Sequence, residues 1–253
     1  MLAKLDYIRR LLATGFCFVL FGVGGLILGF LVFPIVHLFA GSRERGVRAC
    51  RFAVRLCFRA FAYTLSALGP IGHEIHRREL LERKGQLIVA NHPSLIDVVL
   101  LMAYTPNASC IVRAGLFQNI FTRGPVRWSG FVCNDTGERL IDDCVAQIKS
   151  GANLIIFPEG TRTVRGKPLK FHRGAAHVWL KARCPLTLVT IKCEPPTLAR
   201  GEPWYQIPPK RAHFWLNPCD NTRLEYDSAR AVTQYWQDYF SSENQDEPTR
   251  AAD

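Results

Sequence analysis

The feature that most constrains this sequence is a stretch without Lys, Arg, Asp or Glu, which runs from Leu11 to Ser42. A helix needs roughly 20 apolar residues to cross the hydrocarbon core of a bilayer, and this stretch is longer. We therefore predict a membrane segment in one of two forms. It is either one spanning helix or a helical hairpin that bends at Gly24 and Gly25 or at Pro34.

Two other interpretations of the apolar stretch remain open. A cleaved signal peptide would fit the basic start at Lys4, Arg9 and Arg10, although the apolar part of a signal peptide is usually only about 7–15 residues long. A buried helix of a soluble core is the other interpretation.

The residues after this stretch predict a basic amphipathic helix. Four arginines recur at steps of three and four and so share one helix face: Arg48, Arg51, Arg55 and Arg59. Apolar side chains form much of another face: Val47, Val54, Phe58, Phe61 and Leu65. Such a helix suits anionic lipid headgroups. Its charge predicts a position at the cytoplasmic face of a membrane, which in a bacterium is the inner (plasma) membrane.

The net charge of +11 would also suit nucleic acid. No nucleic-acid-binding motif accompanies the charge, so membrane lipids are the predicted partner and nucleic acid is not. The nine cysteines include no CxxC pair, which favours reduced thiols facing a cytosol-like compartment over disulfides or a zinc site. We predict no metal site.

Beyond Gly69 and Pro70, short apolar runs alternate with helical patterns. The runs predict strands at 86–90, 108–113, 131–133, 153–157 and 186–192, and the helical patterns lie at 96–104, 138–149 and 174–182. This alternation predicts an α/β fold, a mostly parallel sheet with flanking helices, preceded by the N-terminal membrane helix or helical hairpin. We divide the chain into an N-terminal membrane segment with its basic amphipathic helix (1–68), a folded domain (69–240) and a disordered acidic tail (241–253).

Two polar clusters directly follow two of the predicted strands. The first runs from Asn91 to Asp97 and the second from Phe157 to Arg162. Ligand sites of parallel sheets gather at the carboxyl ends of the strands, so we expect the two clusters to form one site.

In the first cluster, a turn at Pro93 would bring the carboxylate of Asp97 back to the imidazole of His92. A carboxylate placed there fixes the tautomer, so that the other ring nitrogen can take a proton from a substrate hydroxyl. Ser94 lacks the G-x-S-x-G setting of a nucleophile, which favours direct attack by the substrate over a covalent enzyme intermediate. The spacing alone is also typical of a helix that has Asp97 in its first turn and follows a loop in which the hydrogen bonds of His92 are satisfied locally.

The second cluster suits an anionic or polar ligand. Gly160 permits a tight turn, Thr161 offers a hydroxyl, and Arg162 offers a planar fork for phosphate or carboxylate. An exposed loop with a pair between Glu159 and Arg162 is the alternative interpretation.

Together and in this order, the two clusters resemble the glycerolipid acyltransferase family, of which the lysophosphatidic acid acyltransferases are familiar members. The segment from Asn91 to Asp97 is similar to the family's H-x4-D block, and Phe157 to Arg162 has the letters of its F-P-E-G-T-R block. The stretches 166–175 and 185–191 resemble the blocks that follow. The resemblance covers roughly residues 85–195.

This resemblance implies transfer of a fatty acyl group from an acyl thioester, carried by acyl carrier protein or coenzyme A, to a hydroxyl on a lipid. It makes residues 69–240 the acyltransferase domain, with His92 as the base and Asp97 as its partner. The acceptor site would be shaped by Glu159, Gly160, Thr161 and Arg162. No cofactor is implied. Five further basic residues are candidates for anion contacts: Arg113, Arg123, Arg127, Lys170 and Arg173.

The sequence departs from the family between the two motifs. Lysophosphatidic acid acyltransferases usually end a short strand there with an Arg that is thought to meet the acceptor's phosphate. In the stretch from Gly130 to Asp135 an acid, Asp135, takes that place. A carboxylate repels a phosphate, so we expect a different lysolipid, a lipid without a phosphate at that spot, or a specialised hydroxyl-bearing molecule as acceptor. The alternative is that Arg123, Arg127 or Arg139 supplies the missing charge.

Two other functions fit the same residues. A hydrolase would use His92 to activate water, and an assay of the acyl thioester with and without a lysolipid separates it from a transferase. A catalytically silent protein would only bind lipids, and the presence of both His92 and Asp97 argues against it.

Overall fold

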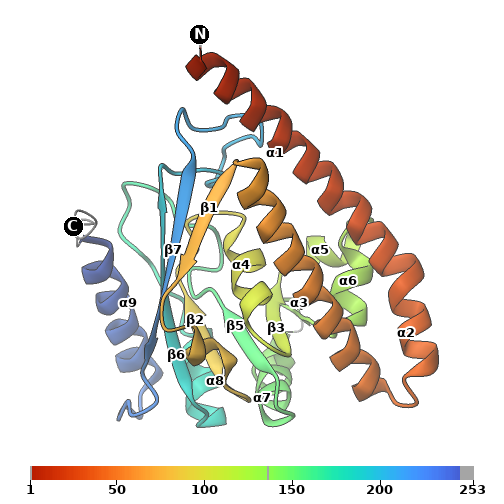
Figure 1. Ribbon diagram of the computed structural model, residues 1–253. Helices are drawn as coiled ribbons and strands as arrows, with labels where there is room; N and C mark the ends of the chain where they lie inside the picture. Colours follow the sequence, from red (N-terminus) through yellow and green to blue (C-terminus); the bar gives the residue numbers. More distant parts are fainter. Residues whose placement is uncertain (1, 136, 246–253) are drawn as a thin grey trace.

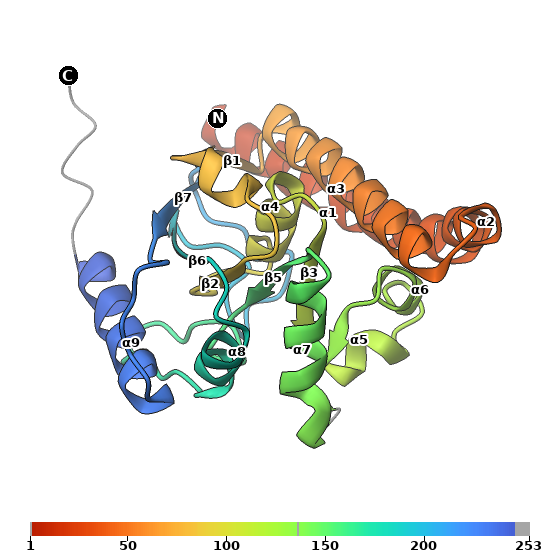
Figure 2. The ribbon, with the colours of Figure 1, turned by 90° about the horizontal axis from the view of Figure 1, so that it is seen from below.

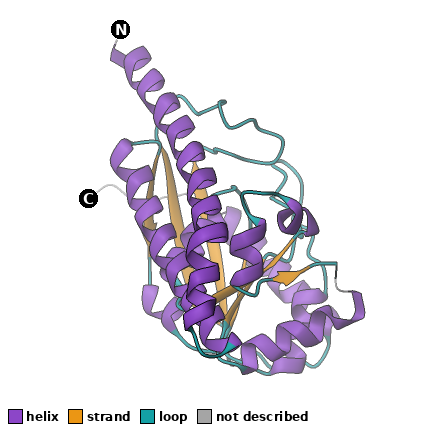
Figure 3. Cartoon of the chain, turned by 90° about the vertical axis from the view of Figure 1, so that its right-hand side faces the viewer, coloured by secondary structure: helices purple, strands orange, loops and turns teal. Residues whose placement is uncertain are grey.

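The computed structural model describes residues 2–135 and 137–245. In this part of the chain a central sheet lies between helices on both faces, and two long N-terminal helices lie along one side (Figures 1 and 2). Viewed from that side, helices lie in front of the strands (Figure 3). The protein is therefore an α/β fold with an N-terminal helical extension.

The extension is a helical rod followed by a returning helix. The rod consists of α1 (Leu2–Ile27), a π-helical turn (Leu28–Val32) and α2 (Phe33–Phe39). The chain then reverses and returns as α3 (Arg43–Leu68). Ser42 begins α3 by accepting a hydrogen bond from the N–H of Arg45, and Gly69, with a φ of 90°, ends it.

The hairpin therefore turns at residues 40–42, and the predicted bends at Gly24 and Gly25 or at Pro34 are wrong. Gly25 serves close packing, because a Cβ built on it would lie 2.2 Å from the carbonyl oxygen of Phe121. Pro34 lies in the first turn of α2, where its missing N–H is tolerated.

The rod docks along its length on the rest of the protein. Near its start, the buried guanidinium of Arg10 donates to the carbonyls of Pro208 and Pro209, at 2.9 and 2.6 Å. Near its end, Gly29 and Gly124 face each other so closely that a Cβ on Gly124 would lie 2.3 Å from the Cα of Gly29. The basic start of the chain is thus packed against the rest of the fold.

The opposite face of the rod is apolar and exposed. Its large exposed side chains include Leu12, Phe16, Val19, Val23, Ile27, Leu31, Leu38 and Phe39. Among the described residues, the helix Leu2–Phe39 is long and apolar enough to cross a membrane. Only 17% of its most apolar window is buried in the protein, which excludes the alternative of a buried core helix.

The arginines of α3 do not form one lipid-facing stripe, so that prediction is wrong. Arg51 is buried and donates to the carbonyls of Ser129 and Gly130 and to the side chains of Asn107 and Gln147. Arg51 turns toward the domain because the carbonyls of Ser129 and Gly130 offer hydrogen-bond acceptors there.

Seven strands form the sheet in the described residues, in the order β1-β7-β6-β2-β5-β3-β4. Their bounds are β1 Ile71–Ile75, β2 Leu87–Ala90, β3 Ala108–Val112, β4 Val132–Cys133, β5 Asn153–Ile156, β6 Leu186–Glu194 and β7 Ala212–Asp220. Only the β6–β7 pair is antiparallel. The predicted mostly parallel sheet is confirmed.

Helices cover both faces of this sheet. They are α4 Asp97–Tyr104, α5 Ala114–Gln118, α6 Arg123–Trp128, α7 Leu140–Lys149, α8 Gly174–Ala182 and α9 Ala229–Gln245, with 3-10 turns at Arg78–Glu82 and Gly137–Arg139. In β2, Ile88 and Ala90 join an apolar cluster with α3 and α4, whereas Leu87 and Val89 join one with α7, α8 and α9. A strand buried on both faces is apolar along its length, which explains why all of β2 and residues 154–156 of β5 are apolar.

The predicted disordered tail begins too early. Helix α9 continues to Gln245, because Val232, Trp236 and Phe240 are buried at steps of four on one face. The rest of that prediction, residues 246–253, lies outside the described residues. Strands β1 and β7 and helices α5, α6 and α9 were not predicted.

Candidate active site

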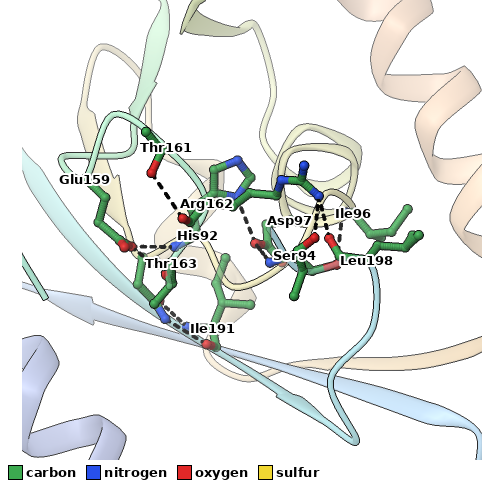
Figure 4. Close-up of polar contacts among 12 residues, drawn as sticks. His92, Ser94, Ile96, Asp97, Glu159, Thr161, Arg162, Thr163, Ile191 and Leu198 are labelled. Atoms are coloured by element: carbon green, nitrogen blue, oxygen red, sulfur yellow. Dashed lines mark hydrogen bonds and ion pairs between the residues drawn. The ribbon is translucent and has the colours of Figure 1, made fainter. Parts of the chain in front are cut away.

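The two polar clusters lie together beyond the carboxyl ends of β2 and β5, as expected from the parallel sheet (Figure 4). Asn91 fixes the exit from β2. Its side-chain amide donates to the carbonyl of Ile191 at 2.9 Å and accepts from the N–H of the same residue at 2.7 Å. The side chain thus imitates a strand partner for β6 and sets the direction of the loop that carries His92.

The turn after His92 brings the imidazole and the carboxylate of Asp97 into contact. Nδ1 of His92 donates to Oδ2 of Asp97 at 2.9 Å, and the N–H of Ser94 donates to the same oxygen at 2.7 Å. The Asp97 side chain is fully buried at the start of α4, whereas 15% of the His92 side chain is exposed. Because Nδ1 holds its hydrogen toward Asp97, Nε2 is left with a lone pair that can accept a proton.

Burial governs the electrostatics of both acids in the site. It raises the pKa of the Asp97 carboxyl, and the hydrogen bonds from His92 and Ser94 oppose that rise. Burial also raises the pKa of Glu159, against hydrogen bonds from the Thr163 hydroxyl and the His92 N–H. In both acids burial disfavours the charged carboxylate, and the hydrogen bonds to it act in the opposite direction.

The second loop is locked to the first through Glu159 and Thr163. Oε1 of Glu159 accepts from the N–H of His92 at 3.0 Å and from the hydroxyl of Thr163 at 2.7 Å. The N–H of Thr163 donates to the carbonyl of His92 at 2.8 Å. Phe157 stacks on the imidazole, with ring centroids 4.2 Å apart. His92 is therefore held through the face of its ring, through Nδ1 and through its backbone N–H and carbonyl groups.

A third loop, from residue 195 to 209, closes the other side of the site. Arg162 holds it by donating to the carbonyls of Leu198 and Ala199, at 2.7 and 2.9 Å. The hydroxyl of Ser94 donates to the carbonyl of Thr197 at 2.8 Å. At least one guanidinium nitrogen of Arg162 is therefore engaged in shaping the site.

Two other arginines flank the second loop. Arg113, at the end of β3, donates to the carbonyl of Gly160 at 2.9 Å, and Arg200 donates to the hydroxyl of Thr161 at 3.3 Å. Gly160 turns with a φ of 65°, a conformation that favours glycine. Positive charge thus borders the loop of the second cluster on two sides.

The structure divides the predicted site residues into two groups. His92, Asp97, the loop 159–162 and Arg113 lie together. Arg123 and Arg127 lie on α6, where Arg123 contacts the ring of Phe30 and Arg127 donates to the carbonyl of Phe117. In the described residues, no polar contact joins either of them, Lys170 or Arg173 to the His92 cluster.

The sequence did not point to Thr163, Arg200 or the stacking of Phe157. Phe157 begins the second motif and Thr163 directly follows it, so the sequence marked both positions. Arg200 carried none, because its contact depends on the path of an irregular loop.

Asp135 is exposed just beyond β4. Val112 pairs with Cys133 in the β3–β4 register, so Arg113 and Asn134 lie at neighbouring strand ends and Asp135 follows. Asn134 accepts a hydrogen bond from the N–H of Ala114. An acid and an arginine therefore emerge close together at this edge. Among the described residues, no cluster of three or more His, Cys, Asp or Glu residues could hold a metal ion.

Comparison with known proteins places the site in context. Residues 72–192 match the protein family described as Acyltransferase. A 1-acyl-sn-glycerol-3-phosphate acyltransferase of Helicobacter pylori is 32% identical over 155 residues, which are 56% of this chain and 58% of that protein. The enzyme of the same name from Pseudomonas aeruginosa is 25% identical over 63% of this chain and 61% of that protein. The matched segment thus spans less than two thirds of either relative.

A solved structure shares the fold. It is the crystal structure of the 1-acyl-sn-glycerophosphate acyltransferase of Thermotoga maritima, with a TM-score of 0.70, 18% identity, and coverage of 98% of this chain and all of that one.

Proposed function

Because residues 72–192 match the Acyltransferase family and the curated relatives are 1-acyl-sn-glycerol-3-phosphate acyltransferases, we propose that this chain transfers a fatty acyl group from an acyl thioester to a hydroxyl of a lysophospholipid or a related lipid. The observation that carries the proposal is the 2.9 Å contact between His92 Nδ1 and Asp97 Oδ2, which leaves Nε2 available as a general base.

The proposed reaction needs no covalent enzyme intermediate. Nε2 of His92 takes the proton of the acceptor hydroxyl as its oxygen attacks the thioester carbonyl carbon. The tetrahedral intermediate collapses, the carbon–sulfur bond breaks, and the imidazolium returns the proton to the leaving thiolate. The buried carboxylate of Asp97 stabilises the imidazolium between these two transfers.

The loop 159–162 would hold the acceptor. Its backbone is fixed through Glu159 and Thr163, and Arg113 and Arg200 border it, which suits a polar or anionic headgroup. The donor would be acyl carrier protein or coenzyme A. Both are cytosolic thiols, which supports work at the cytoplasmic face of the membrane.

The test is an acyl transfer assay with purified protein, each thioester donor and a panel of lysolipids, with products identified by mass spectrometry. We expect His92→Ala to lower turnover by about 10²–10⁴-fold with the fold retained, because a positioned base contributes that much. Asp97→Asn should also lose most activity, because it removes the negative charge that stabilises the imidazolium and offers an NH2 donor that favours the wrong imidazole tautomer.

Two outcomes would contradict this proposal. Turnover of His92→Ala above about a tenth of wild type would exclude His92 as the base. Equal consumption of thioester with and without an acceptor would show a hydrolase instead.

We further propose that the preferred acceptor is not lysophosphatidic acid. The exposed carboxylate of Asp135, just beyond β4, would repel a phosphate monoester. In a competition assay we expect zwitterionic or uncharged acceptors to be preferred, and Asp135→Arg to shift preference toward lysophosphatidic acid. Preference of the wild type for lysophosphatidic acid, with no gain in Asp135→Arg, would show that the substitution is incidental.

A further inference from the structure

A separate pocket of about 770 Å³ lies between the end of the rod, the start of α3 and α6. None of its lining residues belongs to the loops of the candidate active site. Its basic lining residues are His37, Arg43, Arg123 and Arg127, and its aromatic ones are Phe30 and Trp128.

The positive charge of this pocket is unbalanced. No acidic residue lines it. Across residues 2–135 and 137–245, no ion pair joins Arg43, Arg123 or Arg127 to an acid. An adjoining pocket of about 630 Å³ shares Arg43 and Arg127, but Glu44 and Asp143 line it as well. The acid-free pocket is therefore the one suited to an anion.

The walls of the pocket are fixed by contacts between the rod and α6. The indole of Trp128 donates to the carbonyl of Gly29 at 3.1 Å, and Nε2 of His37 lies 3.1 Å from the carbonyl of Trp128. The His37 and Trp128 rings lie 4.7 Å apart. The close approach of Gly29 to Gly124 brings the two helices together. These contacts hold the basic side chains of the pocket on helices that are already in place before a ligand binds.

The pocket lies at the border of the exposed apolar surface. Phe30 lines it and is 53% exposed, and the guanidinium of Arg123 lies 5.1 Å from the centre of its ring. Leu31, Leu38 and Phe39, on the same rod, are 58%, 76% and 81% exposed. A phosphate in the pocket would therefore have apolar surface beside it, on which acyl chains could lie.

We propose that this pocket binds the phosphate of an anionic phospholipid as a non-catalytic site that anchors the rod in the membrane. A lipid headgroup fits better than a free phosphate, because the cations adjoin the apolar surface. The proposal stands independently of the reaction proposed above.

The test uses the full chain in a mild detergent. Phosphatidylglycerol, phosphatidylcholine or inorganic phosphate is added, and bound molecules are counted by native mass spectrometry. We expect one phosphatidylglycerol to bind in preference to phosphatidylcholine. In Arg43→Gln with Arg127→Gln, its affinity should fall by roughly thirtyfold, because each arginine near an anionic lipid contributes about fivefold.

A matched control removes the same charge elsewhere. Arg45 is exposed on the first turn of α3 and Arg230 is exposed on α9, and neither lines the pocket. Arg45→Gln with Arg230→Gln should keep the wild-type affinity within about threefold, particularly in salt that screens surface attraction. Equal losses in the two double variants would overturn the proposal, because general attraction would then explain the binding. Inorganic phosphate binding as tightly as phosphatidylglycerol would overturn the lipid assignment.

Discussion

At His92, orientation depends on three contacts, and only one of them is the hydrogen bond to Asp97. Phe157 restricts the ring from one face, and Glu159 holds the backbone N–H. Glu159 thus acts on the proposed chemistry through another residue. Its carboxylate is mostly buried and accepts two hydrogen bonds on one oxygen. A neutral amide oxygen in the same place could accept both hydrogen bonds. We therefore expect the site to depend on the position of the Glu159 oxygen more than on its negative charge.

This reasoning predicts different results for two substitutions of Glu159. Glu159→Gln keeps an acceptor oxygen, so kcat should stay within about tenfold of wild type. Glu159→Leu leaves the N–H of His92 and the hydroxyl of Thr163 unsatisfied, at about 1–3 kcal/mol each, so kcat should fall by about a hundredfold and the Tm should drop. Steady-state kinetics and thermal unfolding measure both effects. An equal loss of kcat in the two variants would show that the negative charge itself is required.

At the scale of elements, the sequence predicted the central strands, because a strand that is buried on both faces is recognisable as an apolar run. Strand β2 is apolar throughout, β5 is apolar from residue 154, β6 is buried from residue 186 to residue 191, and all three were predicted within one or two residues. Strand β7 alternates buried and half-buried residues and contains Pro218, and β1 contains polar residues near the sheet edge, so neither stood out. The site motifs could be predicted because they directly follow central strands. Contacts from the loop 195–209 could not, since that loop has no periodic pattern.

One link between elements predicts a pH dependence of stability. His73 on β1 lies 3.2 Å from the hydroxyl of Ser66 on α3 and 2.7 Å from that of Tyr104 on α4. Burial, His213 and Arg211 lower the pKa of His73 from its ordinary value of 6.5. The unfolded chain therefore takes up this proton first, so stability that is present above the ordinary pKa is lost as the pH falls below it.

We expect the free energy of unfolding of the wild type to fall more than that of His73→Gln between about pH 7.5 and about pH 5.5. Unfolding in detergent at several pH values, followed by circular dichroism, measures the difference. Parallel curves for the two proteins would contradict the assignment to His73.

At the scale of the whole molecule, the rod and the domain form one body. Arg10 fixes the start of the rod to the loop 195–209, Gly25 and Gly29 fix its other end to Phe121 and helix α6, and the exposed apolar face points away from those contacts. A helix attached along its length cannot cross a bilayer upright without drawing polar surface into the hydrocarbon. We therefore infer that the rod lies along the membrane with its apolar face inserted. The length of the apolar stretch alone could not distinguish this arrangement from a spanning helix.

This arrangement predicts that membrane attachment depends on individual side chains of the exposed face. Leu31 and Leu38 are 58% and 76% exposed, and burying a leucine in an apolar phase contributes about 1.5–3 kcal/mol. Leu31→Asp with Leu38→Asp should therefore release most of the protein from phosphatidylcholine vesicles in a flotation assay at high salt, where charge attraction is screened. Tyr226→Asp, at an exposed position outside the rod, is the control and should float like wild type. Because the substituted leucines are exposed, the fold and the detergent-solubilised activity should persist. Flotation of the double variant at the wild-type level would show that the rod is not the attachment surface.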